Sequence, residues 1–378
     1  MPRNTTTTAD TADTADTADT ADTADTADTA DTADTADTAD TIIRKRKNSM
    51  SALIVQGSAI TGRWHEKTLP ISQLRTSAIG QHQTESLHEW NAKTRDYIIA
   101  NELTAITRYQ ESAKNGLALH FTSSKQRIFS LKLPTKSIDK LFATQVKMVY
   151  DYRILRNERS NEIVNELSMP LSYWSSILGR SLENMPRTVE LVNVALHLSA
   201  RTAMHFKHRV ALPRPMQLSA QILPIIPNPG HGSLPSGHAT QSFMLARMFE
   251  ELHNTHSAFA TDGDPTADLL YRRAQRIATN RTVAGVHFPI DSMAGRVLGT
   301  SLAELLIGLG TEKNLQQRSF NMNAFADDHY HDDLDLSVDL DKSTKRYYCT
   351  DGTVDVIKDA TPVFKWLWNG VAEEWSPQ

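Results

Sequence analysis

Three short groups of polar residues in the second half of the chain could do chemistry. In chain order, the groups are Lys207 with Arg214, Ser236 with Gly237 and His238, and Arg281 with His287 and Asp291. Arginine offers planar, paired N–H donors, lysine offers a compact positive charge, and serine and a glycine amide offer neutral donors. Glycine also lets the backbone approach an anion closely. Together these residue types suit a pocket that holds an oxyanion such as phosphate without a metal.

The two histidines differ in their neighbours, and this difference suggests two roles. His287 precedes Asp291 by four residues, so the carboxylate could hold one ring nitrogen protonated and leave the other facing the anion as nucleophile or ligand. His238 follows the serine–glycine pair and could act as general acid for a leaving oxygen. If a helix begins near His238, its N–H groups and its dipole point at the same place.

The segments that carry these residues have the pattern of helices. From residue 85 onward, apolar residues recur at helical spacing, and alternating runs of β-branched residues are few. Turn signals are also spaced too far apart for a sheet protein. We therefore expect an all-α helical bundle. Its helices are predicted at about residues 86–114, 136–167, 186–209, 239–253, 265–282 and 291–309.

Residues 213–235 are rich in proline and glycine, and they connect the predicted helix at 186–209 to the predicted helix at 239–253. Proline prevents it from being helical throughout. A connection of this length is unusual in a compact domain, and long ordered loops often carry function. We expect residues 216–233 to contribute to substrate specificity.

The beginning of the chain differs in composition from the rest. Residues 8–40 are eleven copies of Thr-Ala-Asp, without aromatic or large aliphatic side chains, so we expect this repeat to be disordered. Without its eleven aspartates, the formal charge changes from −4 to +7. The dense basic cluster at residues 44–47 is interpreted as a solvated linker rather than a nucleic-acid or membrane contact. Met50 is an alternative start.

Three regions are predicted. Residues 1–48 are expected to form the disordered repeat and basic linker, residues 49–312 an all-α domain with its signature at 207–291, and residues 313–378 a C-terminal extension. The extension contains an acidic stretch from Asp327 to Asp341. Hard oxygen ligands could bind a divalent cation there, but we interpret it as a solvated linker.

Several protein classes are disfavoured by composition. The most apolar stretch, residues 293–309, contains Arg296 and Glu304, so we expect no membrane-spanning helix. The amino terminus has no apolar segment followed by a small-residue cleavage site, and a cytoplasmic location is therefore expected. Cys349 is the only cysteine, which excludes an intrachain disulfide and a cysteine-rich zinc site.

The spacing within the three groups resembles a known family. Lys207-x6-Arg214-Pro215, then Pro235-Ser236-Gly237-His238, then Arg281-x5-His287-x3-Asp291 is similar to the three-part signature of the type 2 phosphatidic acid phosphatase and vanadium haloperoxidase superfamily. The resemblance covers residues 207–291 and implies an all-α bundle with a pocket for phosphate or its analogue vanadate.

The resemblance also implies roles for the site residues. In the phosphatases, the position matching His287 forms a phosphohistidine, and the position matching His238 protonates the leaving group and later activates water. In the haloperoxidases, the position matching His287 ligates vanadium. Lys207, Arg214 and Arg281 would then hold the vanadate oxygens together with Ser236 and Gly237.

Two residues bear on the choice between these chemistries. Asn280 stands where the family usually has serine before Arg281, and phosphatases keep that serine more faithfully. His231 lies seven residues before His238, where the bromoperoxidases have a halide-side histidine. Hydrolysis is nevertheless the commoner chemistry in the superfamily and needs no vanadate.

We therefore predict a soluble, metal-independent phosphatase without a cofactor. It would act on a small phosphorylated substrate, would not bind nucleic acid, and could form a homodimer. A vanadate-dependent haloperoxidase is the alternative. A non-catalytic phosphate-binding helical module is a third possibility, although such a module has little reason to keep both histidines and Asp291.

Overall fold

The computed structural model describes residues 87–112, 116–124, 126–135, 137–257, 260–261, 263–328 and 347–376. The Thr-Ala-Asp repeat, the basic cluster, Met50 and the acidic stretch after Asp328 lie outside the described residues. The expectations made for them, and the domain boundaries at residues 48 and 312, stay predictions.

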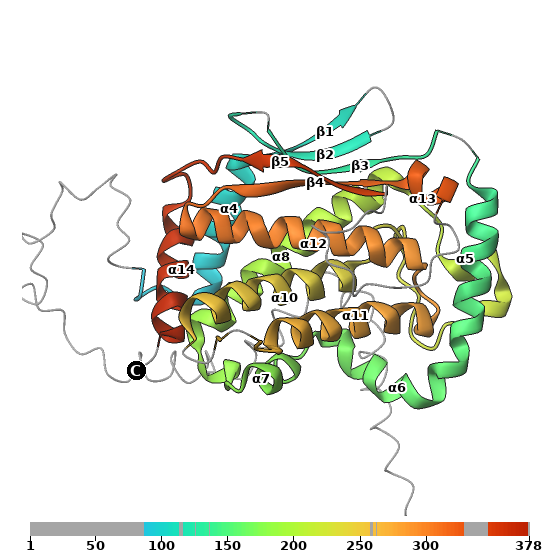
Figure 1. The fold of residues 1–378 in the computed structure, drawn as a ribbon, viewed down its shortest axis with the longest axis horizontal. Coiled ribbons are helices and arrows are strands. Elements are labelled where there is room, and N and C mark those ends of the chain that lie inside the picture. The colour runs from blue at the N-terminus through green and yellow to red at the C-terminus, as the bar shows by residue number, and fades with distance from the viewer. Residues whose placement is uncertain are drawn as a thin grey trace, which may run out of the picture.

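Four helices form the centre of the molecule (Figure 1): α8 (Pro186–Val210), α10 (Gly237–His256), α11 (Thr266–Ala284) and α12 (Pro289–Thr311). All four were predicted from the sequence, to within three residues at each end. Helix α5 (Asp139–Tyr152) crosses one end of this group, and α14 (Pro362–Trp375) crosses the other. The predicted helix at 136–167 consists of α5 and α6 (Arg156–Asn165), which are joined by a 3₁₀ turn, η4 (Arg153–Leu155).

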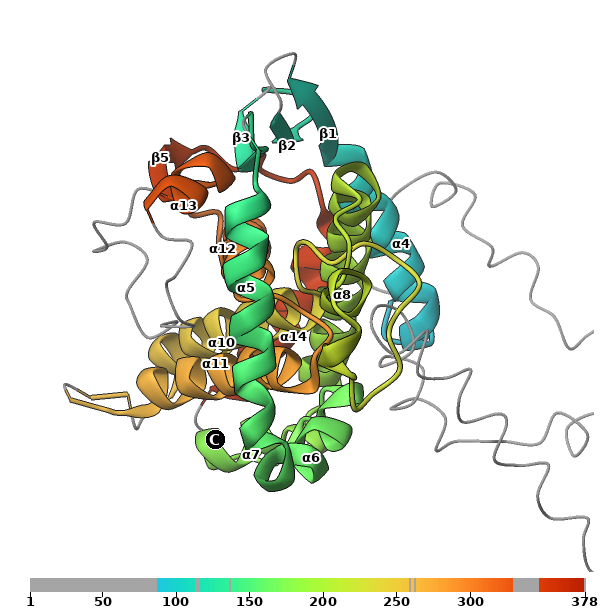
Figure 2. The ribbon, with the colours of Figure 1, turned by 90° about the vertical axis from the view of Figure 1, so that its right-hand side faces the viewer.

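The remaining helices are short or peripheral. Helix α4 (Ala92–Ile106) lies beside α8, and α7 (Ser172–Leu178) packs on α11. Helices α9 (Pro215–Leu218) and α13 (Met322–Asp328) are single short segments. The described residues contain three further 3₁₀ turns: η5 (Glu166–Ser168), η6 (Leu182–Asn184) and η7 (Ala220–Ile222). Figure 2 looks along the bundle and shows α5 in front of it, with α8 to one side.

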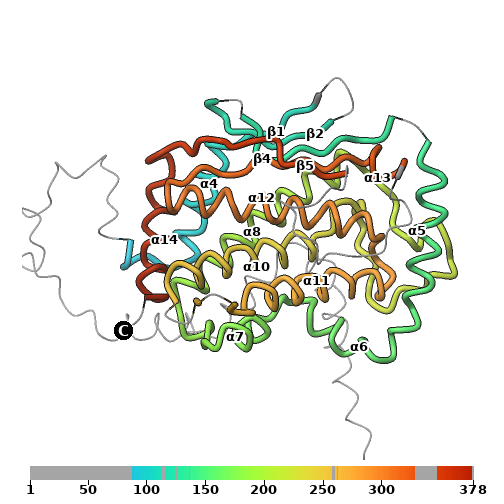
Figure 3. The backbone as a smooth tube through the Cα atoms, viewed as in Figure 1, coloured from blue at the N-terminus to red at the C-terminus, as the bar shows by residue number. Residues whose placement is uncertain are grey.

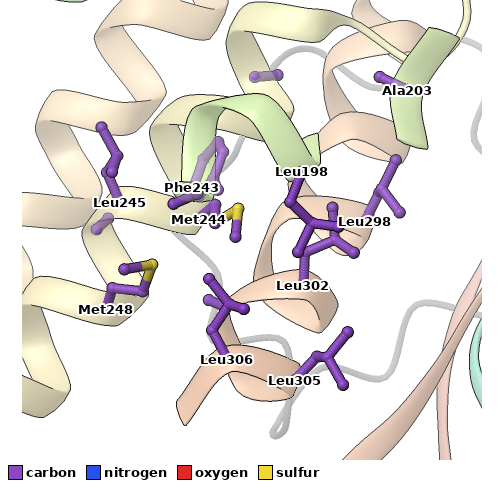
Figure 4. Packing of buried hydrophobic residues seen from close by; sticks show 14 of the residues in the cluster. Leu198, Ala203, Phe243, Met244, Leu245, Met248, Leu298, Leu302, Leu305 and Leu306 are labelled. Atoms are coloured by element: carbon purple, nitrogen blue, oxygen red, sulfur yellow. The ribbon is translucent and has the colours of Figure 1, made fainter. Parts of the chain in front are cut away.

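Helices α10 and α12 approach each other closely because α12 has glycine at the contact. A Cβ at Gly299 would lie 2.2 Å from the Thr240 carbonyl oxygen, and one at Gly295 would lie 2.7 Å from the Ser236 carbonyl oxygen. Leucines of α12 pack against Phe243, Met244 and Met248 of α10 in the buried core (Figure 4). This close contact fixes the start of α10 against the start of α12, which carry two of the three polar groups.

Helix α12 is also the one helix in the described part of the chain that is long and apolar enough to cross a membrane. Its most apolar stretch is 94% buried inside the protein. This burial is typical of the core helix of a folded domain.

A five-stranded mixed sheet covers α12 on one side, so the prediction of an all-α fold is wrong. The strand order is β1 (Thr107–Ser112), β2 (Gly116–Phe121), β3 (Arg127–Lys132), β4 (Leu315–Asn321) and β5 (Tyr348–Val354). Strands β3 and β4 are parallel, with Leu131 opposite Phe320, and the other pairs are antiparallel. Figure 3 shows β3 and β4 side by side although they lie far apart in the sequence.

The sheet explains where the helix prediction at 86–114 failed. The helix ends at Ile106, and the chain continues directly into β1. Strands β2 and β3 are six residues long, and most of their residues are buried rather than alternating between buried and exposed. A short apolar run of this kind cannot be told from a helix segment by its periodicity.

Candidate active site

The last turn of α8 positions the first polar group. Ala211 ends the helix with a positive φ of 49°, and its N–H donates to the Lys207 carbonyl oxygen. The Lys207 side chain is fully buried, and its Nζ donates to the carbonyl oxygens of Gly232 (3.1 Å) and Ser233 (3.3 Å). A Cβ at Gly232 would lie 2.9 Å from the Lys207 carbonyl oxygen, so glycine lets the proline-rich loop run against the helix end.

Arg214 joins the loop to the third polar group. Its guanidinium is 1% exposed. Its Nε donates to the His231 carbonyl oxygen (3.0 Å), and its Nη1 donates to the Val286 carbonyl oxygen (3.0 Å). Because Val286 precedes His287, the second contact holds a cation beside the predicted nucleophile.

The second polar group begins helix α10. Ser236 is the N-cap, its Oγ accepts a hydrogen bond from the Ala239 N–H, and the helix starts at Gly237. The Ser236 N–H donates to the Asp291 carbonyl oxygen (2.9 Å), which ties this helix start to that of α12. The first-turn N–H groups of α10 and the positive end of its dipole therefore lie next to His238, which is 2% exposed.

His287 and Asp291 form a buried pair at the start of α12. The distance from His287 Nδ1 to Asp291 Oδ2 is 3.0 Å, and both side chains are fully buried. Asp291 also accepts hydrogen bonds from the Phe288 N–H (2.9 Å) and from Ser233 Oγ (3.4 Å). When Asp291 is ionised it can only accept, so Nδ1 carries the hydrogen and His287 Nε2 carries the basic lone pair.

The environment of Asp291 perturbs its ionisation. Burial raises the pKa of Asp291 to about 7, although the hydrogen bonds from Phe288 and Ser233 and the charges of Lys207 and Arg214 act in the opposite direction. A group that changes its charge near neutral pH is common where protons are moved.

Arg281 is held by a residue that the sequence did not indicate. Its Nη2 donates to Glu166 Oε2 (2.9 Å) and to the Ile163 carbonyl oxygen (3.1 Å). Asn280, which stands in place of the usual serine, donates through Nδ2 to both carboxylate oxygens of Glu166 (3.0 and 2.9 Å). A glutamate at the end of a helical segment gives no local signal of such a role, because its partners come from α11.

A small cavity joins the second and third polar groups. His238 and Arg281 line it together with five apolar residues: Leu167, Ile226, Pro227, Pro229 and Val286. The predicted general acid and one predicted oxyanion ligand therefore share an apolar-walled space. Ile226, Pro227 and Pro229 belong to the loop segment that we expected to contribute to specificity.

His231 lies beside Arg214 on the other side of the same loop. Its Nδ1 is 3.2 Å from Arg214 Nη2 and 3.1 Å from the Gly232 carbonyl oxygen. It also lines a cleft of ≈ 720 Å³ together with Lys207 and His208. The structure thus places His231 beside Arg214 and on the same cleft as Lys207. Its expected halide-side role stays a prediction.

Hydrogen bonds bring the three groups together: Arg214 contacts Val286, and Ser233 and Ser236 contact Asp291. His238 and Arg281 line one cavity. Comparison with known proteins found that residues 189–314 match the PAP2 superfamily, and no curated protein matched the chain. The matched range contains all eight residues of the three groups, the core helices α10, α11 and α12, and all but the first three residues of α8. The match covers about a third of the chain and supports the resemblance to the type 2 phosphatidic acid phosphatase and vanadium haloperoxidase superfamily, whose activities are of the phosphatase or haloperoxidase type.

Proposed function

We propose that the protein is a metal-independent phosphoric monoester hydrolase that works through a phosphohistidine. The observation that carries this proposal is the fully buried His287–Asp291 pair, 3.0 Å apart, at a place where Lys207 and Arg214 are also buried. A histidine whose Nδ1–H is fixed by a carboxylate presents Nε2 as a nucleophile. Its neighbours are the donors that a phosphoryl group needs.

In the proposed reaction, the substrate phosphate is held by Lys207, Arg214 and Arg281 together with Ser236 and the first N–H groups of α10. The contacts of Lys207 and Arg214 with loop carbonyl oxygens fix the direction of each cation before the substrate arrives. Preorganised donors of this kind stabilise charge that develops on the equatorial oxygens of the transition state.

The chemical steps use the two histidines in turn. The lone pair of His287 Nε2 attacks phosphorus while the bond from phosphorus to the ester oxygen breaks, and His238 donates a proton to the departing alkoxide. His238 then accepts a proton from water as the water oxygen attacks phosphorus. The P–N bond breaks, its electron pair returns to Nε2, and inorganic phosphate is released. Asp291 stabilises the positive charge on His287 through Nδ1–H.

The first test is hydrolysis of p-nitrophenyl phosphate by the purified protein in EDTA. We expect turnover that orthovanadate inhibits, and labelling of the protein by ³²P substrate that mass spectrometry locates on His287. His287→Ala should show neither. Turnover that is retained by this variant would exclude the proposed mechanism.

A haloperoxidase is the second candidate, and the contact of His231 Nδ1 with Arg214 Nη2 favours it. Lys207, Arg214 and Arg281 would then hold vanadate oxygens, and His287 would ligate vanadium, which supplies the activation of peroxide. Absence of phosphate ester hydrolysis, together with bromide oxidation that needs both orthovanadate and peroxide, would select this function.

A further inference from the structure

We propose that Glu166 positions Arg281 for the bound oxyanion and thereby sets the oxyanion affinity of the site. Glu166 lies in η5, outside the matched range 189–314. The inference rests on the proposed function in one respect, the assignment of Arg281 as an oxyanion ligand. Leu167, the next residue, lines the cavity that His238 and Arg281 share, so η5 itself reaches the site.

The Glu166 carboxylate is the meeting point of three side chains from α11. It is fully buried, and it accepts hydrogen bonds from Arg273 Nη2 (2.9 Å), Asn280 Nδ2 and Arg281 Nη2 (2.9 Å). Burying a carboxylate is costly unless it is paired and hydrogen-bonded. Glu166 is therefore held in one place by its partners, and it holds Arg281 in return.

The contacts decide which part of the Arg281 guanidinium can meet an anion. Nη2 carries two hydrogens, and these go to Glu166 Oε2 and to the Ile163 carbonyl oxygen. Glu166 thus fixes the rotation of the guanidinium plane, and with it the direction in which the rest of the guanidinium faces.

Asn280 explains how the carboxylate keeps its own orientation. Its Nδ2 contacts both oxygens of Glu166, and its Oδ1 is 3.4 Å from Arg159 Nη1. The amide of asparagine extends further from the backbone than the serine hydroxyl that is usual in the family. In this chain, the residue before Arg281 therefore supports Arg281 through Glu166.

Two effects of removing the Glu166 charge have opposite signs, and this makes the inference testable. The loss of a negative charge near an anion site strengthens anion binding, whereas the loss of Arg281 orientation weakens it. Glu162 separates the two effects. It lies one turn earlier, in α6, and its carboxylate pairs with Arg273 and Arg276.

The experiment measures orthovanadate binding to the full-length protein by isothermal titration calorimetry, without any turnover. We expect Glu166→Gln to bind orthovanadate on the order of 10–100-fold more weakly than wild type. Glu162→Gln should bind as tightly as wild type or more tightly. Glu166→Asp keeps the charge but withdraws the carboxylate by one methylene, and it should also bind more weakly. Near-ultraviolet circular dichroism of each variant reports whether the core stays folded.

A double-mutant cycle tests whether Glu166 acts through Arg281. In an Arg281→Gln protein, the additional change Glu166→Gln should leave orthovanadate affinity unchanged. The inference is overturned if Glu166→Gln, or Glu166→Asp where the first variant does not fold, binds orthovanadate as tightly as wild type. If the wild-type protein itself does not bind orthovanadate, the oxyanion pocket of the proposed function is wrong, and the role of Glu166 falls with it.

Discussion

Replacing Asp291 by asparagine should change the pH dependence of catalysis in a way that no other substitution at the site reproduces. Asp291 is fully buried, and its pKa is raised to about 7 by that burial. Above this pH the carboxylate accepts the Nδ1–H of His287 and leaves Nε2 basic. Below it, the protonated acid no longer holds His287 in this form, so kcat/KM should rise with pH through about 7.

The size of the effect follows from the pKa. Roughly half of the free protein carries ionised Asp291 at pH 7, and about one tenth carries it at pH 6. We therefore expect kcat/KM for p-nitrophenyl phosphate to fall about tenfold for each pH unit below 6. In Asp291→Asn this acidic limb of the pH profile should disappear. The plateau should be on the order of 10²–10⁴-fold lower, because the neutral amide does not stabilise the positive charge that develops on His287.

Two controls make this prediction sharp. The substrate phosphate also titrates, with a second pKa of about 6, and this contribution persists in Asp291→Asn and can be subtracted. Ser233→Ala removes a weaker contact to the same carboxylate but keeps its charge, so its acidic limb should remain. If Asp291→Asn keeps an unchanged acidic limb, the limb does not arise from Asp291 and the reasoning is refuted.

The same pKa makes a prediction about stability. In the unfolded chain Asp291 has its ordinary pKa of 3.8, whereas in the folded chain the pKa is about 7. As pH rises from about 4 to 7, Asp291 ionises in the unfolded chain but stays protonated in the folded chain. The contribution of this group to the free energy of unfolding therefore falls over this range, by roughly 4 kcal/mol. The difference in unfolding free energy between wild type and Asp291→Asn, measured by urea titration, should change across this window.

The other predictions concern catalysis, anion binding and packing. His238→Ala should reduce kcat by about 10²–10⁴-fold if proton transfer is its role, measured with p-nitrophenyl phosphate; an unchanged kcat would exclude that role. Arg281→Lys should weaken orthovanadate binding because a planar pair of donors is lost; equal affinity by calorimetry would argue against the contact. Gly299→Ala should destabilise the protein by about 1–3 kcal/mol, because the new Cβ meets the Thr240 carbonyl oxygen. Gly230→Ala, where a Cβ meets nothing within 4 Å, is the control in urea unfolding and should be near neutral.

The core helices could be predicted from the sequence because their signals are local. Proline at the first position of α8, and apolar residues on one face of it, predicted a helix at 186–209, and the structure has it at Pro186–Val210. The sheet could not be predicted in the same way. The pairing of β3 with β4 joins segments that are separated in the chain by helices α5 to α12, and no local pattern reports a contact of that kind.

In the candidate site too, features with a local sequence signal could be predicted, and long-range contacts could not. The spacing of the three groups was sufficient to anticipate their convergence, since each lies at the end or the beginning of a core helix. Their partners were not predictable. Glu166 lies in a separate 3₁₀ turn, and Lys207 and Arg214 are held by backbone carbonyl oxygens. A carbonyl group belongs to every residue, so its position depends on the fold alone.

The buried charges connect substrate binding to ionisation. Lys207, Arg214 and Arg281 are cations, and Asp291 and Glu166 are carboxylates, all at most 1% exposed. A bound oxyanion adds negative charge beside Asp291 and so favours its protonated form. By linkage, the pKa of Asp291 in the enzyme–substrate complex should exceed its value in the free enzyme. The acidic limb of kcat should therefore lie at higher pH than that of kcat/KM, and coincident limbs would show that the anion does not approach Asp291.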